Sequence, residues 1–551
     1  MKDNSKFRLD IWGIITLCTI AVYALFLIYP MAHLIQQSVI DGETGQFSMA
    51  NFTKFFSKSY YFNTLFNSFK VSIAATVLSI AIGTPLAYIF SVYKIKGKSL
   101  LNILIIVASM SAPFIGAYSW ILLLGRSGVI TTFFRNIGIN IPDIYGFGGI
   151  VLVMTLQLFP LVFLYAKGAL KNIDNSLVEA ANNLGCSGLK CFFKVVIPLI
   201  MPTLPGRGPS GIHAFLADFG TPMLIGEGYR TFPVVLYTEF INEVGGNDGF
   251  AAAIAVIAIV VTTVVFLAQK YVSNKNAFSL NALHPIEEKT PKGLTGFLAH
   301  AASYLIVGIA ILPQVYVSYT SFKKTEGKIF VSGYSLESYA SAFGKLGRSI
   351  QNTIIIPLCA LVIIVLLAIM IAYLVVRRKN ALTSTVDIIS MIPYIVPGTV
   401  LGIALLTGFN KKPVMLSGTM LIMVVALVIR RLPYTIRSSV AILQQIPMSI
   451  EEAAISLGAS KMKSFFKVTV PMMTAGIVSG AILSWVTMIS ELSTAIILYT
   501  GRTKTLTVAV YTEVVRGNYG IAAALSTILT VLTVISLLIF NRVNGGKDLS
   551  L

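Results

Sequence analysis

The chain has 551 residues; 56% of them are hydrophobic, 12% are charged, and the formal net charge is +20. Soluble domains have about 45–50% apolar and about 25% charged residues, so this composition excludes an ordinary soluble protein and is typical of a chain that lies in a bilayer. The net charge would also suit a nucleic-acid-binding protein, but the placement of the basic residues, described below, favours membrane topology as its cause and no nucleic-acid partner.

Apolar stretches long enough to cross a bilayer recur along the whole chain. A spanning helix needs about 20 mainly apolar residues, and by this rule we expect about twelve spans. They lie near residues 12–33, 64–92, 100–124, 147–166, 197–225, 249–270, 297–317, 352–376, 384–409, 414–430, 472–499 and 519–541. The sequence therefore predicts an all-α polytopic membrane protein.

The N-terminal segment sets the expected orientation. "MKDNSKFR" is followed by a long apolar run without a small-x-small cleavage site, so we expect a retained first helix rather than a secretory signal. Lys and Arg gather in segments on the same side as this N-terminus, including 94–98 and 377–379, whereas 322–328 and 411–412 are basic exceptions on the other side. By the positive-inside rule we expect a cytoplasmic N-terminus.

One polar segment occurs twice. Residues 170–199 align with residues 443–472 at an offset of 273 positions, and fifteen of the thirty aligned positions are identical. In the first copy the identical residues are Leu170, Ile173, Ser176, Glu179, Ala180, Ala181, Leu184, Gly185, Ser187, Lys190, Phe192, Phe193, Lys194, Val195 and Pro198. We call these two copies the first and second repeated segments.

The duplication extends beyond the repeated segments. Further features recur at matching spacings: Asn67 with Asn352, Ala87–Tyr88 with Ala372–Tyr373, Asp218 with Glu491, and "YTE" at 237–239 with "YTE" at 511–513. Six spans return the chain to its starting side, so the halves are expected to be two parallel six-helix repeats. We place the first half at 1–272, a polar cytoplasmic linker at 273–296 and the second half at 297–551.

Each repeated segment is expected to form an elbow of two short helices. The Ser-x-x-Glu patterns at 176–179 and 449–452 have the spacing of a capping box, and Gly185 and Gly458 can end the first helix. A basic second helix, with phenylalanines on its membrane side, then precedes the next span: Lys190, Phe192, Phe193, Lys194 and Pro198, and Lys463, Phe465, Phe466, Lys467 and Pro471. Either the glutamates are caps and the lysines contact anionic lipid, or the paired elbows dock onto a two-fold partner.

The pattern Glu-Ala-Ala, three further residues, Gly and a hydrophobic-Pro end resembles the cytoplasmic EAA loop of type I ATP-binding-cassette importer permeases. The resemblance covers essentially the whole chain, as a fusion of two permease halves. In that family the loop forms a coupling helix that fits a cleft on the ATPase subunit. By resemblance, the coupling residues are Glu179, Ala180, Ala181, Gly185, Glu452, Ala453, Ala454 and Gly458.

This resemblance implies a transport subunit rather than an enzyme. The sequence contains no G-x-x-x-x-G-K-[ST] phosphate loop, so ATP with Mg is expected on two partner ATPase subunits and no cofactor on this chain. The family further implies an extracytoplasmic substrate-binding protein as partner, alternating access as mechanism, and the cytoplasmic (inner) membrane of a bacterium as location.

Asp218 and Glu491 are candidate residues of the translocation pathway. Both are expected within spans, where a carboxylate costs about 2.5–3.5 kcal/mol and usually faces a cavity or a partner. The alternative is that each lies at the outer interface, hydrated or bonded to Thr221, Ser493 or Arg230.

The cargo is open between several solutes. "ADFGTPMLIG" at 217–226, the fused layout and the length are similar to the ferric-iron branch of these permeases, and the other cargoes to consider are thiamine, a polyamine, a phosphonate or a sugar phosphate. Fe(III) prefers oxygen ligands, which adds Tyr88 and Tyr373 to the pathway candidates. No metal site is identified, because the residues that bind softer metals are scattered: His33, His213, His284, His300, Cys18, Cys186, Cys191 and Cys359.

Residues 202–213 depart from the repeat. They include Pro205, Arg207 and Pro209 where the second copy has a continuous span, and an interior proline costs a helix about 3 kcal/mol. Either this stretch is a broken helix that lines a pathway, or it is an altered coding stretch.

Two other protein classes share parts of this pattern. A twelve-span secondary transporter would also have parallel halves, but it would need neither matched repeated segments nor an ATPase. A channel or scaffold would lack ATP-driven uptake.

Overall fold

The computed structural model describes residues 10–41, 44–110, 113–186, 188–200, 216, 218–241, 248–275, 284, 286 and 288–543. The stretch 202–213, for which the sequence left two interpretations open, lies outside these described residues.

Helices dominate the part of the chain that precedes residue 276. They are α1 (Ile11–Tyr23), the π-turn η1 (Ala24–Ile28), α2 (Tyr29–Ser38), α3 (Ala50–Ser57), α4 (Ser59–Val92), α5 (Lys98–Met110), α6 (Pro113–Leu124), α7 (Val129–Asn136), α8 (Phe147–Leu170), α9 (Asn175–Asn183), α10 (Gly188–Cys191), η2 (Phe192–Val196), α11 (Ile197–Ile200), α13 (Gly220–Ile225), α14 (Phe232–Ile241) and α15 (Asp248–Lys275).

The rest of the chain adds a second set of helices and one hairpin. These elements are α16 (Gly293–Thr320), the antiparallel strands β1 (Lys323–Glu326) and β2 (Ile329–Tyr334), α17 (Glu337–Arg377), α18 (Ala381–Ile395), α19 (Gly398–Gly408), α20 (Met420–Gln445), α21 (Met448–Ser456), α22 (Lys461–Ser464), η4 (Phe465–Thr469), α23 (Val470–Met472), α24 (Thr474–Ile489), α25 (Ala495–Leu498), α26 (Leu506–Arg516) and α27 (Tyr519–Val543).

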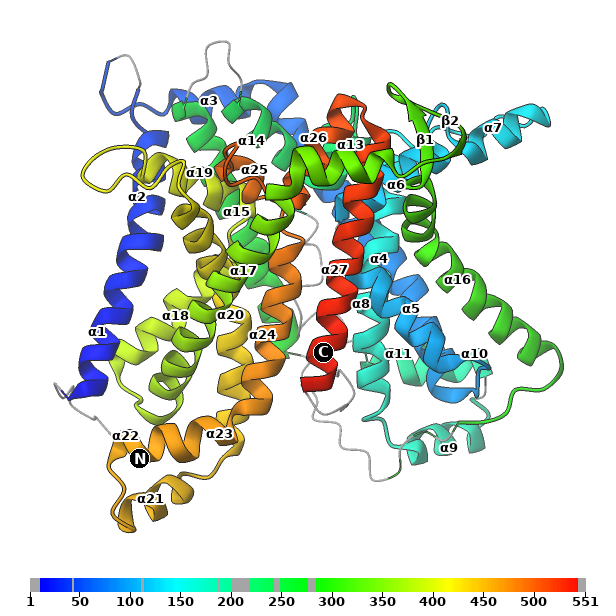
Figure 1. The fold of residues 1–551 in the computed structure, drawn as a ribbon. Coiled ribbons are helices and arrows are strands. Elements are labelled where there is room, and N and C mark those ends of the chain that lie inside the picture. Colours follow the sequence, from blue (N-terminus) through cyan, green and yellow to red (C-terminus); the bar gives the residue numbers. More distant parts are fainter. Residues whose placement is uncertain are drawn as a thin grey trace.

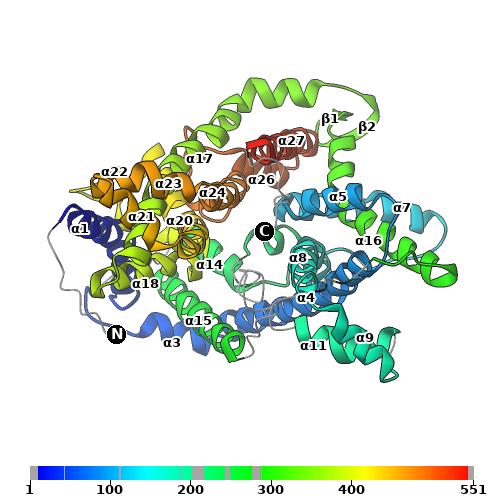
Figure 2. The same cartoon turned by 90° about the horizontal axis from the view of Figure 1, so that it is seen from below.

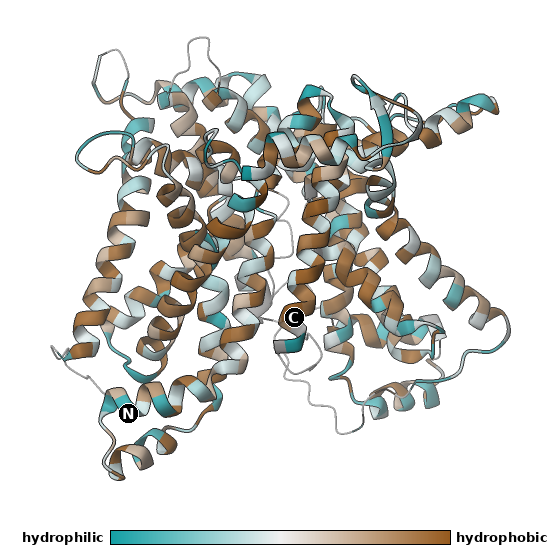
Figure 3. Ribbon diagram, in the orientation of Figure 1, coloured by the Kyte–Doolittle hydropathy of each residue, from teal (hydrophilic) through white to brown (hydrophobic). Residues whose placement is uncertain are grey.

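The long helices stand side by side as two bundles between two faces (Figure 1). We call the end that carries α9, α10, α21 and α22 the lower face, and the end that carries α3, α7 and the hairpin β1–β2 the upper face. Figure 3 shows hydrophobic residues along the helices between these faces, whereas α9 and the hairpin are mostly hydrophilic. This distribution is expected of helices whose middle portions contact lipid.

Among the described residues, eight helices are long and apolar enough to cross a membrane. Two bent pairs, α18 with α19 (110°) and α22–α23 with α24 (67°), raise the number to ten if each pair is one span. The polytopic all-α prediction is therefore confirmed. The expected number of about twelve stays a prediction, because the expected spans 100–124 and 197–225 include residues outside the described ranges.

The larger bend has a local cause at Val396–Pro397. A residue before proline is driven out of the helical region, and Val396 is extended with φ −76° and ψ 125°. Helix α18 therefore ends at Ile395, and α19 starts after Pro397, which has no N–H to leave unpaired.

The two halves use the same contacts at the upper face. In the first half, Ser68 Oγ accepts from Phe232 N (2.8 Å) at the start of α14. In the second half, Thr353 Oγ1 accepts from Leu506 N (2.7 Å) at the start of α26. Neighbouring asparagines also agree: Asn67 donates to Arg230 O (3.0 Å), and Asn352 donates to the carbonyls of residues 502 and 504 (2.9 Å each). The Asn67–Asn352 match is thus a structural equivalence.

The first long helix of each half packs against helices of the other half. Helices α1 and α2 pack on α17, α18 and α19, and Trp12 stacks near Tyr373 with ring centroids 4.4 Å apart. Conversely, α16 packs on α4, α5 and α6. The expected halves 1–272 and 297–551 are therefore interlocked in space, and the view from below places α9 and α21 on opposite sides of the centre (Figure 2).

Candidate functional site

The first helix of each repeated segment ends in the same motif. In α9, Gly185 has φ +79°, its N–H donates to Asn182 O (3.0 Å), and Cys186 N donates to Ala181 O (2.9 Å). In α21, Gly458 has φ +91°, its N–H donates to Ile455 O (2.9 Å), and Ala459 N donates to Ala454 O (3.1 Å). This is a Schellman motif, and its left-handed position favours glycine. The expectation that Gly185 and Gly458 end these helices agrees with the geometry.

The expected helix starts were wrong. Helix α9 begins at Asn175 with Asp174 as its N-cap, whose Oδ1 accepts from Ser176 N (3.0 Å). Helix α21 follows Pro447 and has no side-chain cap. The serines of the Ser-x-x-Glu patterns are instead the second residues of α9 and α21, because Asp174 is as good a cap as serine and because Pro447, in an extended conformation, precedes α21. The side chain of Glu179 instead accepts from Asn175 Nδ2 (2.7 Å).

The tips of both repeated segments are exposed and apolar. Leu184 is 87% exposed and Leu457 is 90% exposed, the highest values among the large hydrophobic side chains of the described residues. Glu179 and Glu452 are exposed on the same helices. Sequence reasoning recorded Leu184 as identical to its counterpart but did not treat it as a site residue. Each repeated segment thus presents one exposed leucine at the lower face.

The second helix of each elbow contains a π-turn at the same place, η2 and η4. Phe192 and Phe465 point inward and are 4% and 1% exposed, whereas Phe193 and Phe466 are 62% and 55% exposed. The expectation that both phenylalanines of each pair lie on the membrane side is wrong for Phe192 and Phe465, which are buried in the protein, and stays a prediction for Phe193 and Phe466. Consecutive residues of a helix point about 100° apart, so one phenylalanine of each pair can face the protein while the other faces outward.

The inward phenylalanines contact the two tyrosines proposed for a pathway. Tyr88 lies 4.8 Å from Phe192 between ring centroids, and Tyr373 lies 4.8 Å from Phe465. The hydroxyl of Tyr373 also donates to Glu451 Oε2 (3.2 Å). Both tyrosines thus join a long helix, α4 or α17, to a repeated segment, and this placement favours a mechanical role over ion coordination.

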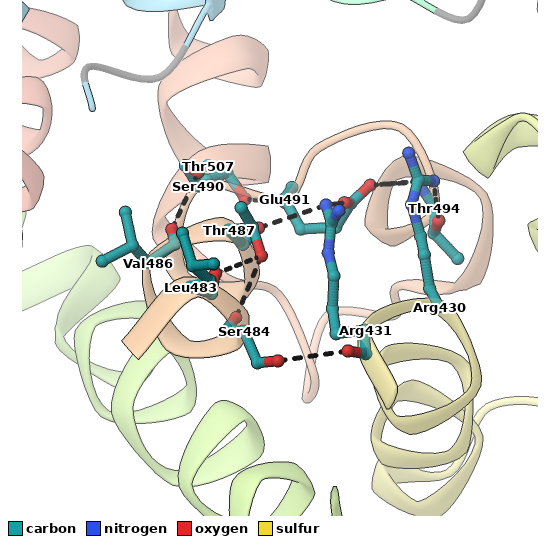
Figure 4. Close-up of polar contacts among 10 residues, drawn as sticks. All are labelled: Arg430, Arg431, Leu483, Ser484, Val486, Thr487, Ser490, Glu491, Thr494 and Thr507. Carbon is teal, nitrogen blue, oxygen red and sulfur yellow. Dashed lines mark hydrogen bonds and ion pairs between the residues drawn. The ribbon is translucent and has the colours of Figure 1, made fainter. Parts of the chain in front are cut away.

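Between the middle of α20 and the upper end of α24, Glu491 is enclosed by two arginines (Figure 4). Its carboxylate is 3.3 Å from Arg430 Nη1 and forms an ion pair with Arg431 Nη2, and it accepts from Thr494 N (3.1 Å). The three charged side chains are 15%, 12% and 4% exposed for Arg430, Arg431 and Glu491. The two arginines are partners that neither expected alternative named, and Glu491 is buried between them.

A glycine makes this cluster sterically feasible. A Cβ added at Gly398, the first residue of α19, would lie 1.4 Å from Arg430 Nη1. The guanidinium therefore occupies the space a side chain would fill, and Arg430 also donates to Thr494 Oγ1 (2.7 Å). The cluster ties α19, α20, α24 and α25 together.

Asp218 has different surroundings from its counterpart Glu491. Its Oδ1 accepts from Gly220 N (3.1 Å), and no ion pair involves it within the described residues. At the offset of 273, Gln157 and Leu158 replace the two arginines. The described part of the chain shows no bond between Asp218 and Glu491, and the two carboxylates have different partners.

No group of three or more His, Cys, Asp or Glu residues that could hold a metal ion occurs within the described ranges. The four cysteines are free thiols.

Comparison with known proteins shows which proteins this chain is similar to. A family model described as "Binding-protein-dependent transport system inner membrane component" matches residues 69–277 and again 338–546. The chain is 27% identical to the ferric transport system permease protein FbpB of Actinobacillus pleuropneumoniae, over 94% of this chain and 76% of the relative. It is also 27% identical to the putative ferric transport system permease protein FbpB 1 of Haemophilus influenzae, over 89% and 78%.

A shorter relative matches about half of the chain. The putative 2-aminoethylphosphonate transport system permease protein PhnU of Salmonella typhimurium is 23% identical over 48% of this chain and 92% of its own length. The duplicate family match and the half-length relative agree with a chain made of two fused halves.

Proposed function

The chain belongs to the family of binding-protein-dependent transport system inner membrane components, and from this premise we propose that it is the permease subunit of an ATP-driven importer of ferric iron. The observation that carries the proposal is the pair of repeated segments at the lower face, each with a Schellman turn and an exposed leucine at its tip. Two equivalent elbows on opposite sides of the centre suit a partner with two-fold symmetry.

The proposed partners are two ATPase subunits at the lower face and an extracytoplasmic binding protein at the upper face. The lower face, where α1 begins, would then be cytoplasmic in a bacterial inner membrane. Closure of the ATPase pair on ATP would move the two elbows together. Coupling requires only that ATP and the loaded binding protein both stabilise the outward-open arrangement.

Glu179 and Glu452 are proposed docking residues for the ATPase subunits, together with the two alanines that follow each of them. They are exposed beside the leucine tips, and their charge would meet basic groups on the partner.

Asp218 is the better of the two pathway candidates. Fe(III) favours oxygen ligands, and among the described residues no cationic side chain neutralises the carboxylate of Asp218. Glu491 is already paired with two arginines, so its charge is not available to a passing cation. We therefore assign Asp218 to the pathway and Glu491 to the scaffold.

A phosphonate is the second candidate cargo. The cluster around Glu491 contains two guanidinium groups and one carboxylate, and this excess of positive charge would favour an anion. The half-length relative is named for 2-aminoethylphosphonate transport, so this phosphonate is the second cargo to be tested.

Deleting this chain is expected to abolish uptake of labelled ferric iron by iron-starved cells, and the intact chain is expected to restore it. A chain with both Glu179 and Glu452 replaced by glutamine should not restore uptake although it reaches the membrane, because the elbows would no longer dock. Uptake of labelled 2-aminoethylphosphonate is measured in the same strains. Loss of phosphonate uptake alone would replace iron as the cargo, and no change in either solute would contradict the proposal.

Gly458→Ala is expected to lower uptake about fivefold to thirtyfold, because a non-glycine residue in the left-handed region costs about 1–2 kcal/mol. Gly458→Asn should retain more uptake, since asparagine tolerates this conformation. The matched control is Gly138→Ala, which has φ +80° and open space around its Cβ but lies after α7 at the upper face. Equal losses in the Gly458 and Gly138 variants would contradict a specific role for the elbow.

A further inference from the structure

The second repeated segment is anchored to α17 by a buried ion pair. Arg377 Nε lies 2.9 Å from Glu451 Oε1, and the side chains are 9% and 4% exposed. Arg377 also donates to Ile446 O (2.7 Å), just before α21. A charge-assisted pair with these additional bonds fixes the lower end of α17 to the start of α21. Movement of the second elbow is thereby transmitted to a long helix of the bundle.

The first repeated segment has no such pair. By the spacing that matches Asn67 with Asn352, the position equivalent to Arg377 is Val92. By the offset of 273, the position equivalent to Glu451 is Val178. Two valines can supply apolar contact but no directional bond. The contact of Tyr88 with Phe192 joins α4 to the second helix of the first elbow. If both elbows move their bundles, the first helix of this elbow, α9, requires its own connection to α4.

The linker between the halves makes that connection. At one end, Lys289 N donates to Val92 O (2.7 Å), and Lys94 N donates to Lys289 O (3.0 Å). These two bonds form a short parallel bridge with the chain that leaves α4. Glu288 adds an ion pair to Lys98, the first residue of α5.

At its other end the linker holds the start of α9. Asn175 N donates to His284 O (2.8 Å), and His284 N donates to Asp174 Oδ2 (3.2 Å). The five steps from His284 to Lys289 can span at most about 16–18 Å, so the linker fixes how far α9 can lie from α4.

We propose that the linker residues His284, Glu288 and Lys289 brace the first repeated segment against α4, in place of the ion pair that braces the second. This inference rests on the proposed function for its consequence, namely that the linker carries motion from one ATPase subunit. The contacts that form the brace lie within this chain and do not depend on the proposed function. The linker therefore joins the two halves covalently and also holds the first repeated segment in place against α4.

The decisive variant lengthens the brace. A six-residue Gly-Ser peptide is inserted after Ile286, between the two bonded ends, and the matched control carries the same peptide after Phe278, in the part of the linker that precedes His284. Both proteins are assembled with their partner subunits. Hydrogen–deuterium exchange is measured on peptides that cover 170–183 and 88–98, with 443–456 as an internal reference.

The insertion after Ile286 should raise amide exchange about tenfold or more in 170–183 and leave 443–456 unchanged, because loss of the brace frees only the first elbow. Iron uptake per ATP hydrolysed should fall about fivefold or more, the lower end of typical coupling effects. Exchange equal to the wild type, or equal changes from both insertions, would overturn the brace. The exchange measurement needs no transport, so failure of the wild type to take up iron would count against the proposed cargo alone.

A point substitution gives an independent test. Asp174→Asn keeps one oxygen to cap α9 but loses the second oxygen that accepts from His284 N. It should reproduce the exchange change in part, whereas Asp174→Asn with wild-type exchange in 170–183 would contradict the contact with His284.

Discussion

Replacing both Leu184 and Leu457 with aspartate is expected to abolish iron uptake while the permease reaches the membrane in wild-type amount. Neither side chain contributes to the core, since they are 87% and 90% exposed, so the fold should tolerate the change. Burying a leucine against a partner contributes about 1.5–3 kcal/mol. Loss of both contacts would cost about 3–6 kcal/mol, or at least about a hundredfold in affinity for the ATPase subunits.

The measurement is copurification of the ATPase subunits with the tagged permease, together with labelled iron uptake. Each single variant should lose only its own half of the interaction and keep part of the bound ATPase. The control is the double methionine variant, which conserves volume and hydrophobicity and should couple normally. Stoichiometric ATPase in the double aspartate variant would show that the leucine tips are not the docking surface.

The features that occur twice in the chain were the ones predictable from sequence. A left-handed turn after a helix strongly favours glycine, and the same glycine in both copies, Gly185 and Gly458, located the ends of α9 and α21 correctly. The matching spacing from Asn67 to Ala87–Tyr88 and from Asn352 to Ala372–Tyr373 likewise identified the two asparagines, which both donate to upper-face carbonyls. The two halves can be compared with each other, and a residue that is identical in both is a better candidate for a shared structural role than one that differs.

Features present in only one half escaped sequence reasoning. Arg377 with Glu451, and Arg430 with Arg431 around Glu491, have no counterparts in the first half, so the repeat gave no reason to pair them. The linker contacts of His284 and Lys289 join residues more than a hundred positions apart, and three of the four bonds are between backbone atoms, which no side-chain pattern records.

The exchange of first helices also had no sequence signal. Hydropathy gives the length and polarity of a span but not the bundle on which it packs, because lipid and a neighbouring helix are equally apolar. Small and aromatic contacts decide the location of α1, such as Trp12 against Tyr373 and Phe465. The sequence does not show that these side chains meet, and the contacts could be recognised only in the three-dimensional structure.

The carboxylates Asp218 and Glu491 are equivalent in sequence, yet their neutralisation should have opposite consequences. Glu491→Gln leaves Arg430 and Arg431 buried without their counter-charge, and breaking such a buried cluster costs about 3–5 kcal/mol. We expect a lower thermal midpoint and a reduced amount of folded permease in detergent. Asp218→Asn removes no ion pair within the described residues, so it should keep the wild-type midpoint and lose iron uptake.

A combined variant separates charge from shape at the Glu491 cluster. Changing Arg430 and Arg431 to methionine together with Glu491→Leu removes all three charges and keeps apolar bulk, so folding should recover relative to Glu491→Gln alone. Uptake should recover with it if Glu491 only holds α19, α20, α24 and α25 together, because no cargo contact would be lost. Recovery of the midpoint without recovery of uptake would instead assign the arginines to the transport pathway, and it would favour an anionic cargo over ferric iron.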